Sequence, residues 1–529
     1  MQKRVKEYLK EKIGREVKLE HPARGEWGDW AVYGNVDIKP DETVEKTEHV
    51  GGFTNIWLKN EWLISQLTKV PEARERNGMT MVIDYSAPNI ARPFGIGHLR
   101  STIIGQALYN LYKYLGYETI GDNHLGDWGT QFGKLLYMIE RTGTEDLSIA
   151  NLEKLYVEFH KQAEDHLEME KGARNWFLRL EKGDPVAKEL WQKCVDASMA
   201  EFDRVYNLLS VKIDNAYGES FYEARMVVVV GEAKKRQIAT MSQGAWVIEI
   251  TGIKTPLMLV KSDGATTYAT RDLATLKFRQ EMWNPDLIIY EVGEEQTMHF
   301  EQVFGAARRL GYVSEHTKLV HTRHGLYLDT DGKKFSTREG KTIRLEEVLD
   351  EAVERAKKLG SADEETAKAV GVGAIKYFDL SHNVQSDIVF DWEKVMALEG
   401  NSGPYIQYTY ARCQSVLKKA EYLTLNPSPN LGEGNQKGEV LSAEELSILR
   451  YFYRFEEEVG EAAERFAPNL MCNFLFELAQ RYNSFYNKHS ILQAESGSSR
   501  ELRLLITKAV GNILKTGLEL LGIAAPDKM

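Results

Sequence analysis

Two polar segments in close succession have the residue types that chemistry on a nucleotide requires. Ser86-Ala87-Pro88-Asn89 forms a Pro-Asn corner after an apolar stretch, and Gly95-Ile96-Gly97-His98 stands just before a predicted helix. The first N–H groups of a helix are unpaired and its dipole is positive there, so this position suits a phosphate. Glycines let the backbone approach closely, and His98 opens the helix and can donate a hydrogen bond. These segments predict a nucleotide-binding loop.

A third segment, residues 331–341 with the sequence DGKKFSTREGK, is basic and flanked by glycine. Nucleotidyl transfer spreads negative charge over phosphate oxygens, which Lys, Arg and Mg²⁺ neutralise. We therefore predict Lys334 and Arg338 as catalytic cations, with Lys333 and Lys341 as substitutes. A basic loop alone is usually only solvated, so this interpretation depends on the nucleotide loop.

The elements that must position these segments alternate between strand and helix. Strands are predicted at 79–85, 286–292 and 318–321, and helices at 99–114 and about 298–311. This alternation predicts a Rossmann-like, doubly wound parallel sheet. Ligands of such sheets bind at the carboxyl ends of the strands, which is where these polar segments stand.

Two further domains flank this α/β domain, which we place at 73–342. Residues 1–72 predict a small α/β domain, with a charged helix over 2–13 and a buried strand at 52–58. Residues 343–529 predict an all-α domain. An insertion of about 134–260 interrupts the sheet; it is helical and charge-rich at first and then carries the β-branched runs 227–230 and 247–250.

Composition excludes several classes of protein. No apolar run reaches the roughly 18 residues of a spanning helix, and the charged N-terminus is not a secretory signal. Cys194, Cys413 and Cys472 are far apart, which predicts a reducing cytoplasm and no zinc site. The net charge of −11 argues mildly against a nucleic-acid partner, although both ends of the chain are near neutral. We expect no membrane association and a monomer.

The segment with the sequence NHLGDWGTQFG, at 123–133, completes a pattern that resembles a known family. Together with 86–89 and the run GIGHLRST at 95–102, it resembles the catalytic domain of arginyl-tRNA synthetases, which are class I aminoacyl-tRNA synthetases. The resemblance implies activation of L-arginine with ATP and Mg²⁺ to arginyl-adenylate, release of pyrophosphate, and transfer of arginine to tRNA(Arg) with release of AMP. It further implies that tRNA must be bound for efficient activation.

The resemblance also assigns residues to the nucleotide. Gly95, Gly97 and His98 match the family's HIGH loop, Lys334 matches its KMSK loop, and Gly293, Glu294 and His299 match the segment that binds adenosine. Gly95 replaces the first histidine of the HIGH loop, and Thr337 replaces the last lysine of the KMSK loop. Arg92, three residues before Gly95, is a hypothetical substitute for the missing histidine.

A set of polar residues matches the family's arginine pocket in type and spacing. A guanidinium group prefers planar carboxylate and amide acceptors. The resemblance places Asp84, Tyr268 and Asp272 against the guanidinium, with Asp84 where Glu is common. The α-amino and carboxylate end is assigned to Asn89 and Gln296, with His98 nearby. A lone Asp or Asn is usually a surface or capping residue, but five matches in order favour the pocket.

The C-terminal domain resembles the family's anticodon-binding domain. Tyr405, Tyr408 and Arg412 share one face of a predicted helix, and aromatic and Arg side chains suit unstacked bases. A tyrosine-rich helix core is the equal alternative for each tyrosine. Tyr486 and the C-terminal Met529 are further candidates for tRNA contact. The N-terminal domain resembles a shortened form of the family's additional domain, which touches the D-loop of tRNA.

Two other readings remain open at this point. Gly95 and Thr337 would also suit a catalytically weak paralogue that binds arginine or RNA as a regulator. A class I enzyme for another amino acid, such as cysteine, is the other alternative, and the missing zinc ligands and the acidic pocket argue against it.

Overall fold

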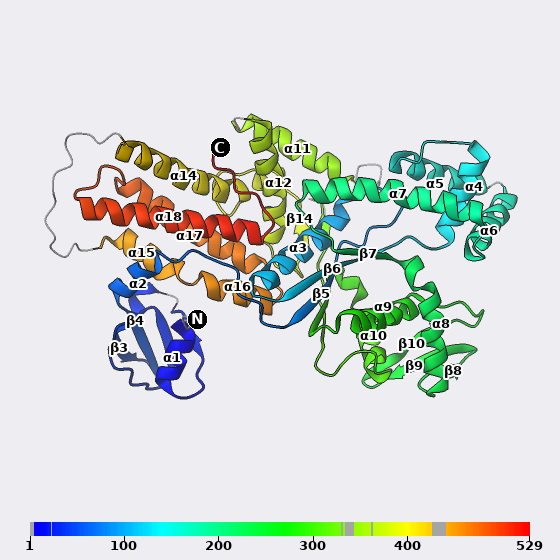
Figure 1. Cartoon of the computed structure of the whole chain (residues 1–529), viewed down its shortest axis with the longest axis horizontal. Helices are drawn as coiled ribbons and strands as arrows, with labels where there is room; N and C mark the ends of the chain where they lie inside the picture. The colour runs from blue at the N-terminus through cyan, green and yellow to red at the C-terminus, as the bar shows by residue number, and fades with distance from the viewer. Residues whose placement is uncertain are drawn as a thin grey trace.

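A five-stranded parallel sheet lies near the middle of an elongated molecule (Figure 1). The computed structural model describes residues 5–22, 24–164, 166–329, 332–333, 343–360, 363–425 and 441–529. The strand order is β12-β11-β5-β6-β7. The strands are β5 (Thr80–Asp84), β6 (Glu118–Leu125), β7 (Asn215–Gly218), β11 (Leu287–Tyr290) and β12 (Lys318–His321). This arrangement agrees with the predicted doubly wound sheet.

Both faces of the sheet are covered, which explains why its strands are apolar throughout. Met81 and Ile83 pack with helix α3 (Leu99–Tyr114), whereas Val82 faces the layer of α9 (Tyr268–Trp283) and α10 (Thr297–Arg309). Helix α3 is buried along most of its length, because C-terminal helices cover its other side.

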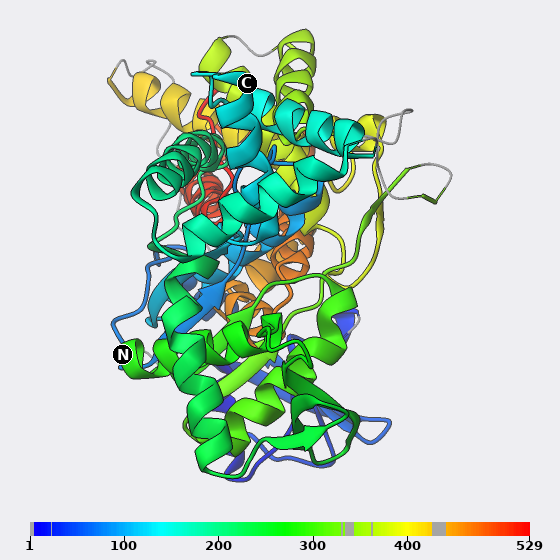
Figure 2. The same cartoon turned by 90° about the vertical axis from the view of Figure 1, so that its right-hand side faces the viewer.

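The predicted insertion is not continuous, because β7 returns to the main sheet between two separate excursions of the chain. The first excursion consists of the helices α4 (Thr130–Thr142), α5 (Ile149–Ala163), α6 (Leu167–Glu181) and α7 (Pro185–Leu208). The second consists of α8 (Glu219–Lys235) and an antiparallel sheet of β8 (Thr240–Ser242), β9 (Ala245–Ile250) and β10 (Ile253–Val260). Figure 2 shows both excursions at one end of the molecule. The β-branched run 227–230 lies inside α8.

The N-terminal domain is an antiparallel sheet with two helices. Its strand order is β1-β2-β4-β3. The elements are α1 (Val5–Ile13), β1 (Leu19–Glu20), β2 (Trp30–Tyr33), β3 (Val44–Val50), β4 (Phe53–Leu58) and α2 (Asn60–Gln66). It packs beside the C-terminal helices through α2 and α15 (Ala443–Phe452).

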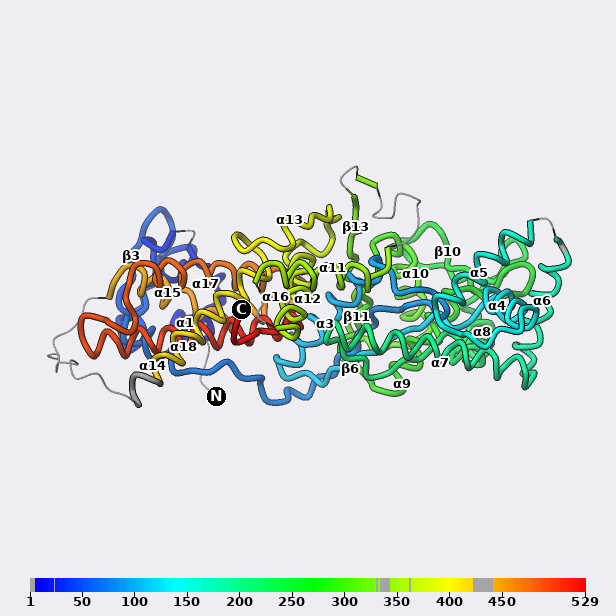
Figure 3. Tube along the Cα trace, turned by 90° about the horizontal axis from the view of Figure 1, so that it is seen from above, coloured from blue at the N-terminus to red at the C-terminus, as the bar shows by residue number. Residues whose placement is uncertain are grey.

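In its described residues the C-terminal region is helical apart from the short strand β14 (Ile388–Val389), which pairs with β13 (Tyr327–Leu328) of the preceding domain. Its last residues return toward the middle of the long axis, beside α12 (Glu364–Leu380; Figure 3). The helices are α11 (Leu345–Lys358), α12 (Glu364–Leu380), α13 (Trp392–Val395), α14 (Gly403–Leu425), α15 (Ala443–Phe452), α16 (Phe455–Glu464), α17 (Asn469–Lys488) and α18 (Gly497–Leu520).

Candidate active site and RNA-binding cavity

The predicted arginine- and nucleotide-binding residues gather at the carboxyl ends of β5, β6 and β11. Asp84 ends β5, and its Cα partner in the neighbouring strand is Tyr290, which ends β11. His124 lies near the end of β6. The chain leaves β5 toward β6 on one side and later returns to β11 on the other. This edge is therefore the switch point at which open parallel sheets bind ligands.

The corner at 86–89 is held in a strained backbone conformation. Ser86 and Ala87 have φ of 75° and 43°, a region that non-glycine residues rarely occupy. Two side chains fix them: the Ser86 amide donates to Oγ of Ser101 at 2.9 Å, and the Ala87 amide donates to Oδ1 of Asn123 at 2.9 Å. Strain of this kind persists where surrounding contacts over-determine it, and it is common at functional sites.

The nucleotide loop is joined by hydrogen bonds to residues that follow the basic loop. The amide of Ile96 donates to the carbonyl of Ile343 at 3.0 Å, and the amide of Leu345 donates to that of Phe94 at 2.9 Å. Gly97 lies in a 3₁₀ turn that leads into α3, and an added Cβ there would meet nothing within 4 Å. His98 is half-buried against the ring of Phe94.

The predicted catalytic cations Lys334 and Arg338 lie outside the described residues, as do Thr337 and Lys341. Lys333 is described and exposed, and its amide donates to Oδ1 of Asp329 at 2.8 Å. The described residues that follow the basic loop, 343–345, are thus held beside the nucleotide loop.

Arg92 is exposed and its guanidinium lies over the ring of Tyr156 in α5, 5.3 Å from the centroid. Arg344 also contacts α5, through an ion pair of 2.9 Å with Glu153. Two arginines that flank the nucleotide loop are thus both held by the first excursion.

Asp84 has a partner within the chain that the sequence did not reveal. Its Oδ2 accepts a hydrogen bond from Nη2 of Arg279 at 2.8 Å, and Nε of the same guanidinium donates to Asp122 at 2.7 Å. All three side chains are buried. Burial raises the pKa of Asp84, and Arg279 opposes that shift. One feature of the sequence could have indicated a buried ion pair here: Asp122 is a charged residue in an otherwise largely uncharged strand.

Asp272 and His299 touch each other, although they were assigned to different substrates. His299 Nε2 donates to Oδ2 of Asp272 at 2.5 Å. Burial opposes a charge on His299, but the hydrogen bond and the charge of Asp272 outweigh it and raise the pKa of the imidazole. The side chain of Asp272 stays about one-fifth exposed, at 19%. Asp272 also affects the pKa of Asp84 and of buried Tyr290, so these groups share one region.

The remaining predicted residues surround this region and face outward. Tyr268 is 72% exposed at the start of α9, with the guanidinium of Arg271 5.5 Å from its ring. Asn89 and Gln296 are exposed, Gln296 in the 3₁₀ turn that precedes α10. Glu294, in the same turn, is exposed, and Gly293 pairs with His324 by a parallel bridge.

The region as a whole is acidic. Arg271 is held by Glu219 at 3.1 Å and Glu223 at 3.2 Å. Burial raises the pKa of Glu219 to about 7, and the charge of Arg271 opposes this shift. Burial also lowers the pKa of His124 to about 4, so this imidazole is neutral at pH 7. Carboxylates outnumber the cations here, which suits a cationic ligand.

The segment 123–133 mainly holds neighbouring elements of the site in place. Both Asp127 oxygens accept hydrogen bonds from Ser220, at 2.9 Å from the amide and 2.6 Å from the hydroxyl. The indole of Trp191 donates to the backbone carbonyl of Asp127 at 2.8 Å, and Trp128 packs edge-on against it. This segment fixes the first turn of α8 beside the acidic region.

A cavity of about 820 Å³ lies in the C-terminal domain. The guanidinium of Arg412 lies 4.9 Å from the ring centroid of Tyr408 and 4.7 Å from that of Tyr486. Asn483 accepts a hydrogen bond from Arg412 at 2.5 Å. The lining residues include four of the five that were predicted to contact tRNA: Tyr408, Arg412, Tyr486 and Met529.

Tyr405 does not line this cavity. Its hydroxyl accepts a hydrogen bond from Nδ2 of Asn483 at 3.0 Å, and its ring packs against Phe476. Tyr405 thus fixes Asn483, which in turn holds Arg412. The helix-core alternative describes this tyrosine better than direct contact with RNA.

Among the residues that the structure describes, no group of three or more His, Cys, Asp and Glu side chains is placed to hold a metal ion. Within the same residues, no helix combines the length and the apolar character that crossing a membrane requires.

Two family models cover most of the chain. The model of the class I (R) tRNA synthetase catalytic domain matches residues 61–392, and that of the DALR anticodon binding domain matches 406–529. The arginine–tRNA ligase of Chloroflexus aurantiacus is 39% identical over 516 residues, which cover 93% of this chain and 88% of that protein. The chain belongs to the arginine–tRNA ligase family. The arginine–tRNA ligase of Clostridioides difficile is similar at 37% identity, over 93% of this chain and 89% of that protein.

Solved structures agree with the fold. The arginyl-tRNA synthetase of Thermus thermophilus superposes with a TM-score of 0.84 at 22% identity, covering 99% of this chain and all of that one. That of Plasmodium falciparum gives 0.82 at 24% identity, covering 98% and 97%. The predicted family, the fold class and the class of activity, an arginine–tRNA ligase, are thereby confirmed.

Proposed function

We propose that this chain activates L-arginine at the acidic edge of its parallel sheet and transfers it to tRNA(Arg). The observation that carries this proposal is the carboxylate cluster at the switch point of the sheet. Asp272, Asp84 and Glu219 bring negative charge to one region; among the described residues, Asp84 and Glu219 each pair with an arginine of the chain, whereas Asp272 pairs with the imidazole of His299. A substrate guanidinium group can therefore bind Asp272.

In this proposal Asp272 binds the substrate guanidinium and displaces or shares His299. Asp84 acts through its charge and holds Arg279, so that the floor of the pocket stays rigid. Tyr268 covers the guanidinium from the exposed side. Asn89 and Gln296, at the rim, bind the α-amino and carboxylate end of arginine.

The nucleotide lies between the two loops that bracket this pocket. Gly95, Gly97 and His98 receive the phosphates at the start of α3, where unpaired N–H groups and the helix dipole favour negative charge. The open space beside Gly97 leaves room for them. Gly293, Glu294 and His299 bind the adenosine end. Lys334 and Arg338 supply the cations for the pyrophosphate, and Arg92 adds positive charge beside Gly95.

The reaction needs no covalent nucleophile from the protein. The arginine carboxylate attacks the α-phosphate of ATP, pyrophosphate leaves, and the tRNA then takes the arginyl group and releases AMP. Mg²⁺ bound with ATP neutralises the phosphate charge. The chain contributes position and electrostatics, which dominate catalysis of this kind.

The cavity in the C-terminal domain receives bases of tRNA(Arg). Tyr408, Arg412 and Tyr486 form a stacked surface that fits unpaired bases, and stacking on such surfaces is worth about 1–3 kcal/mol per base. We also propose that the protein works as a monomer in the cytoplasm; three buried cysteines whose pKa values are raised by burial fit a reducing compartment.

Charging of tRNA(Arg) with radiolabelled arginine tests this function. We expect arginyl-tRNA to form with arginine and not with lysine, and Arg412→Ala to reduce charging at low tRNA concentration. Equal charging with lysine would contradict the assignment of the acidic pocket.

A further inference from the structure

Lys376, in the middle of α12, is a buried lysine that the reaction does not use. It is 1% exposed, and its ammonium group donates to the carbonyl of Leu209 at 2.5 Å and to that of Gly522. Within the part of the chain that the structure describes, no carboxylate pairs with it. Burial lowers its pKa to about 7. A buried amine without a counter-ion costs stability, so its two contacts call for an explanation.

The first contact leads to the active site. Leu209 directly follows α7 and begins the turn 209–212. The amide of Lys212 donates to Oε1 of Gln106 at 2.6 Å, and its carbonyl accepts from the hydroxyl of Tyr85. Tyr85 is fully buried and directly precedes the strained corner at 86–89. Lys376 is therefore linked to the proposed arginine site through the turn 209–212 and the side chain of Tyr85.

The second contact leads to the RNA-binding cavity. Gly522 starts the C-terminal tail, which we define as 522–529. Gln407 donates to the carbonyl of Ala524 at 2.8 Å, and Tyr410 donates to Asp527 at 2.8 Å. Asp527, Lys528 and Met529 line the cavity. The tail is thus fixed at several points between Lys376 and the cavity wall.

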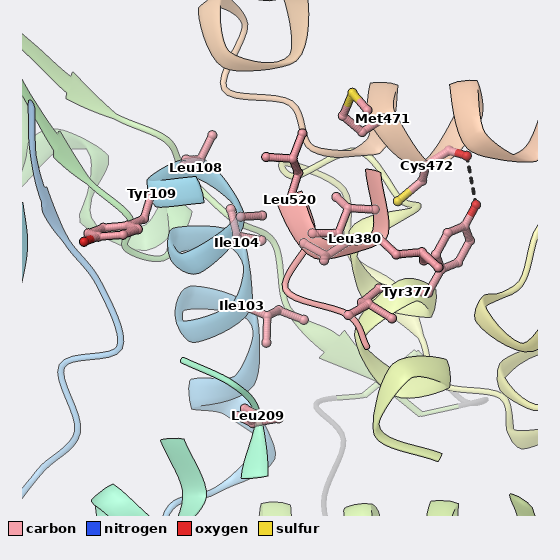
Figure 4. Close-up of a cluster of buried hydrophobic side chains, with 14 of the residues drawn as sticks. Ile103, Ile104, Leu108, Tyr109, Leu209, Tyr377, Leu380, Met471, Cys472 and Leu520 are labelled. Atoms are coloured by element: carbon pink, nitrogen blue, oxygen red, sulfur yellow. Dashed lines mark hydrogen bonds between the residues drawn. The ribbon is translucent and has the colours of Figure 1, made fainter. Parts of the chain in front are cut away.

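Both contacts meet where α3, α7, α12 and the end of α18 converge. Figure 4 shows part of this junction: Leu520 lies between Ile104 of α3 and Leu380 of α12, and Leu209 lies beside α3. The packing is tight: a Cβ added to Gly522 would lie 2.9 Å from Nζ of Lys376, and φ of Gly522 is 69°. Packing this close leaves little room for the tail and the turn to move independently of each other.

We propose that Lys376 is a positioning residue that couples the RNA-binding cavity to the arginine site by holding the C-terminal tail and the turn 209–212 in one register. The proposal rests on the proposed function, in that RNA must occupy the cavity. Coupling of this kind is reciprocal, and its usual size is about 5- to 150-fold in affinity.

The test is the ratio of arginine dissociation constants without and with saturating tRNA(Arg), measured by calorimetry on the full-length protein. We expect a ratio of about fivefold or more for the wild type and below about twofold for Lys376→Met. A merely structural loss would change both affinities equally and leave the ratio intact. The matched control is Tyr377→Phe on the same helix, which loses hydrogen bonds to Asn401 and to the Cys472 carbonyl at 2.7 and 2.8 Å, two partners that lie outside the tail and the turn. It should keep the wild-type ratio.

Gly522→Ala tests the same link from the tail, and it replaces Lys376→Met if circular dichroism shows that variant to be unfolded. It should also bring the ratio below about twofold. A wild-type ratio near one, or a wild-type ratio in the folded variants, would overturn the proposal. Failure of the wild type to bind tRNA(Arg) at all would instead overturn the proposed function.

Discussion

Replacing Asp272 with Asn removes the charge that we assign to guanidinium recognition and keeps the size of the side chain. The side chain of Asp272 is 19% exposed, and within the part of the chain that the structure describes its partner is His299, 26% exposed, at 2.5 Å. A hydrogen bond to a charged group contributes about 1.5–3 kcal/mol. At about 1.4 kcal/mol per tenfold change, this corresponds to an increase of roughly 10- to 150-fold in the KM for arginine.

The assay is arginine-dependent ATP–pyrophosphate exchange in the presence of tRNA(Arg), with each substrate varied in turn. The KM for ATP should change by less than about threefold, because Asp272 faces the amino acid. Glu281→Gln is the control: it removes a carboxylate from the last turn of the same helix, where the side chain is 66% exposed and its ion pair is long, at 4.0 Å. An Asp272→Asn variant with an unchanged KM for arginine, or with equal losses for both substrates, would refute the reasoning.

Three further predictions concern other parts of the site. Arg279→Met should destabilise the sheet by about 3–5 kcal/mol, because two buried carboxylates lose their counter-ion. The measurement is hydrogen exchange at the amides of β5 and β11, and a loss of stability below about 1 kcal/mol would contradict the prediction. The pKa of His299 is raised above its ordinary value of about 6.5, and the KM for arginine should fall as the pH rises through it. Deprotonation of His299 removes the positive charge that competes with the substrate for Asp272. The variant His299→Gln should therefore show a flatter dependence of this KM on pH. Arg412→Ala should raise the KM for tRNA by about tenfold and leave that for ATP unchanged, whereas equal changes in both would argue for misfolding.

The sequence predicted the regular elements well where hydrophobic patterns are long. The helix at 99–114 and the strand at 318–321 have the bounds of α3 and β12. The short strand β7, with the sequence NAYG, was missed because it has no apolar pattern and exists through its pairing with β6. The β-branched run 227–230 lies in a helix because Val229 and Met226 pack into the core below it, and tertiary burial overrides local preference.

The sequence predicted which residues belong to the candidate site, but not which of them contact one another. The family resemblance assigned Asp84 and Asp272 to one pocket, and the structure shows them in one electrostatic environment. The sequence could not show that Arg279, far along the chain, reaches Asp84, or that His299 binds Asp272. Such pairs depend on tertiary distances that no local pattern records. The roles of Tyr405 and Lys376 were hidden for the same reason.

The most direct test of the whole account is ATP–pyrophosphate exchange by the purified protein, with tRNA(Arg) present, using arginine and its neutral analogue citrulline. The account predicts exchange with arginine and little or none with citrulline, because the acidic pocket binds a cation. Comparable exchange with both, or none with either while arginine and tRNA still bind, would contradict it.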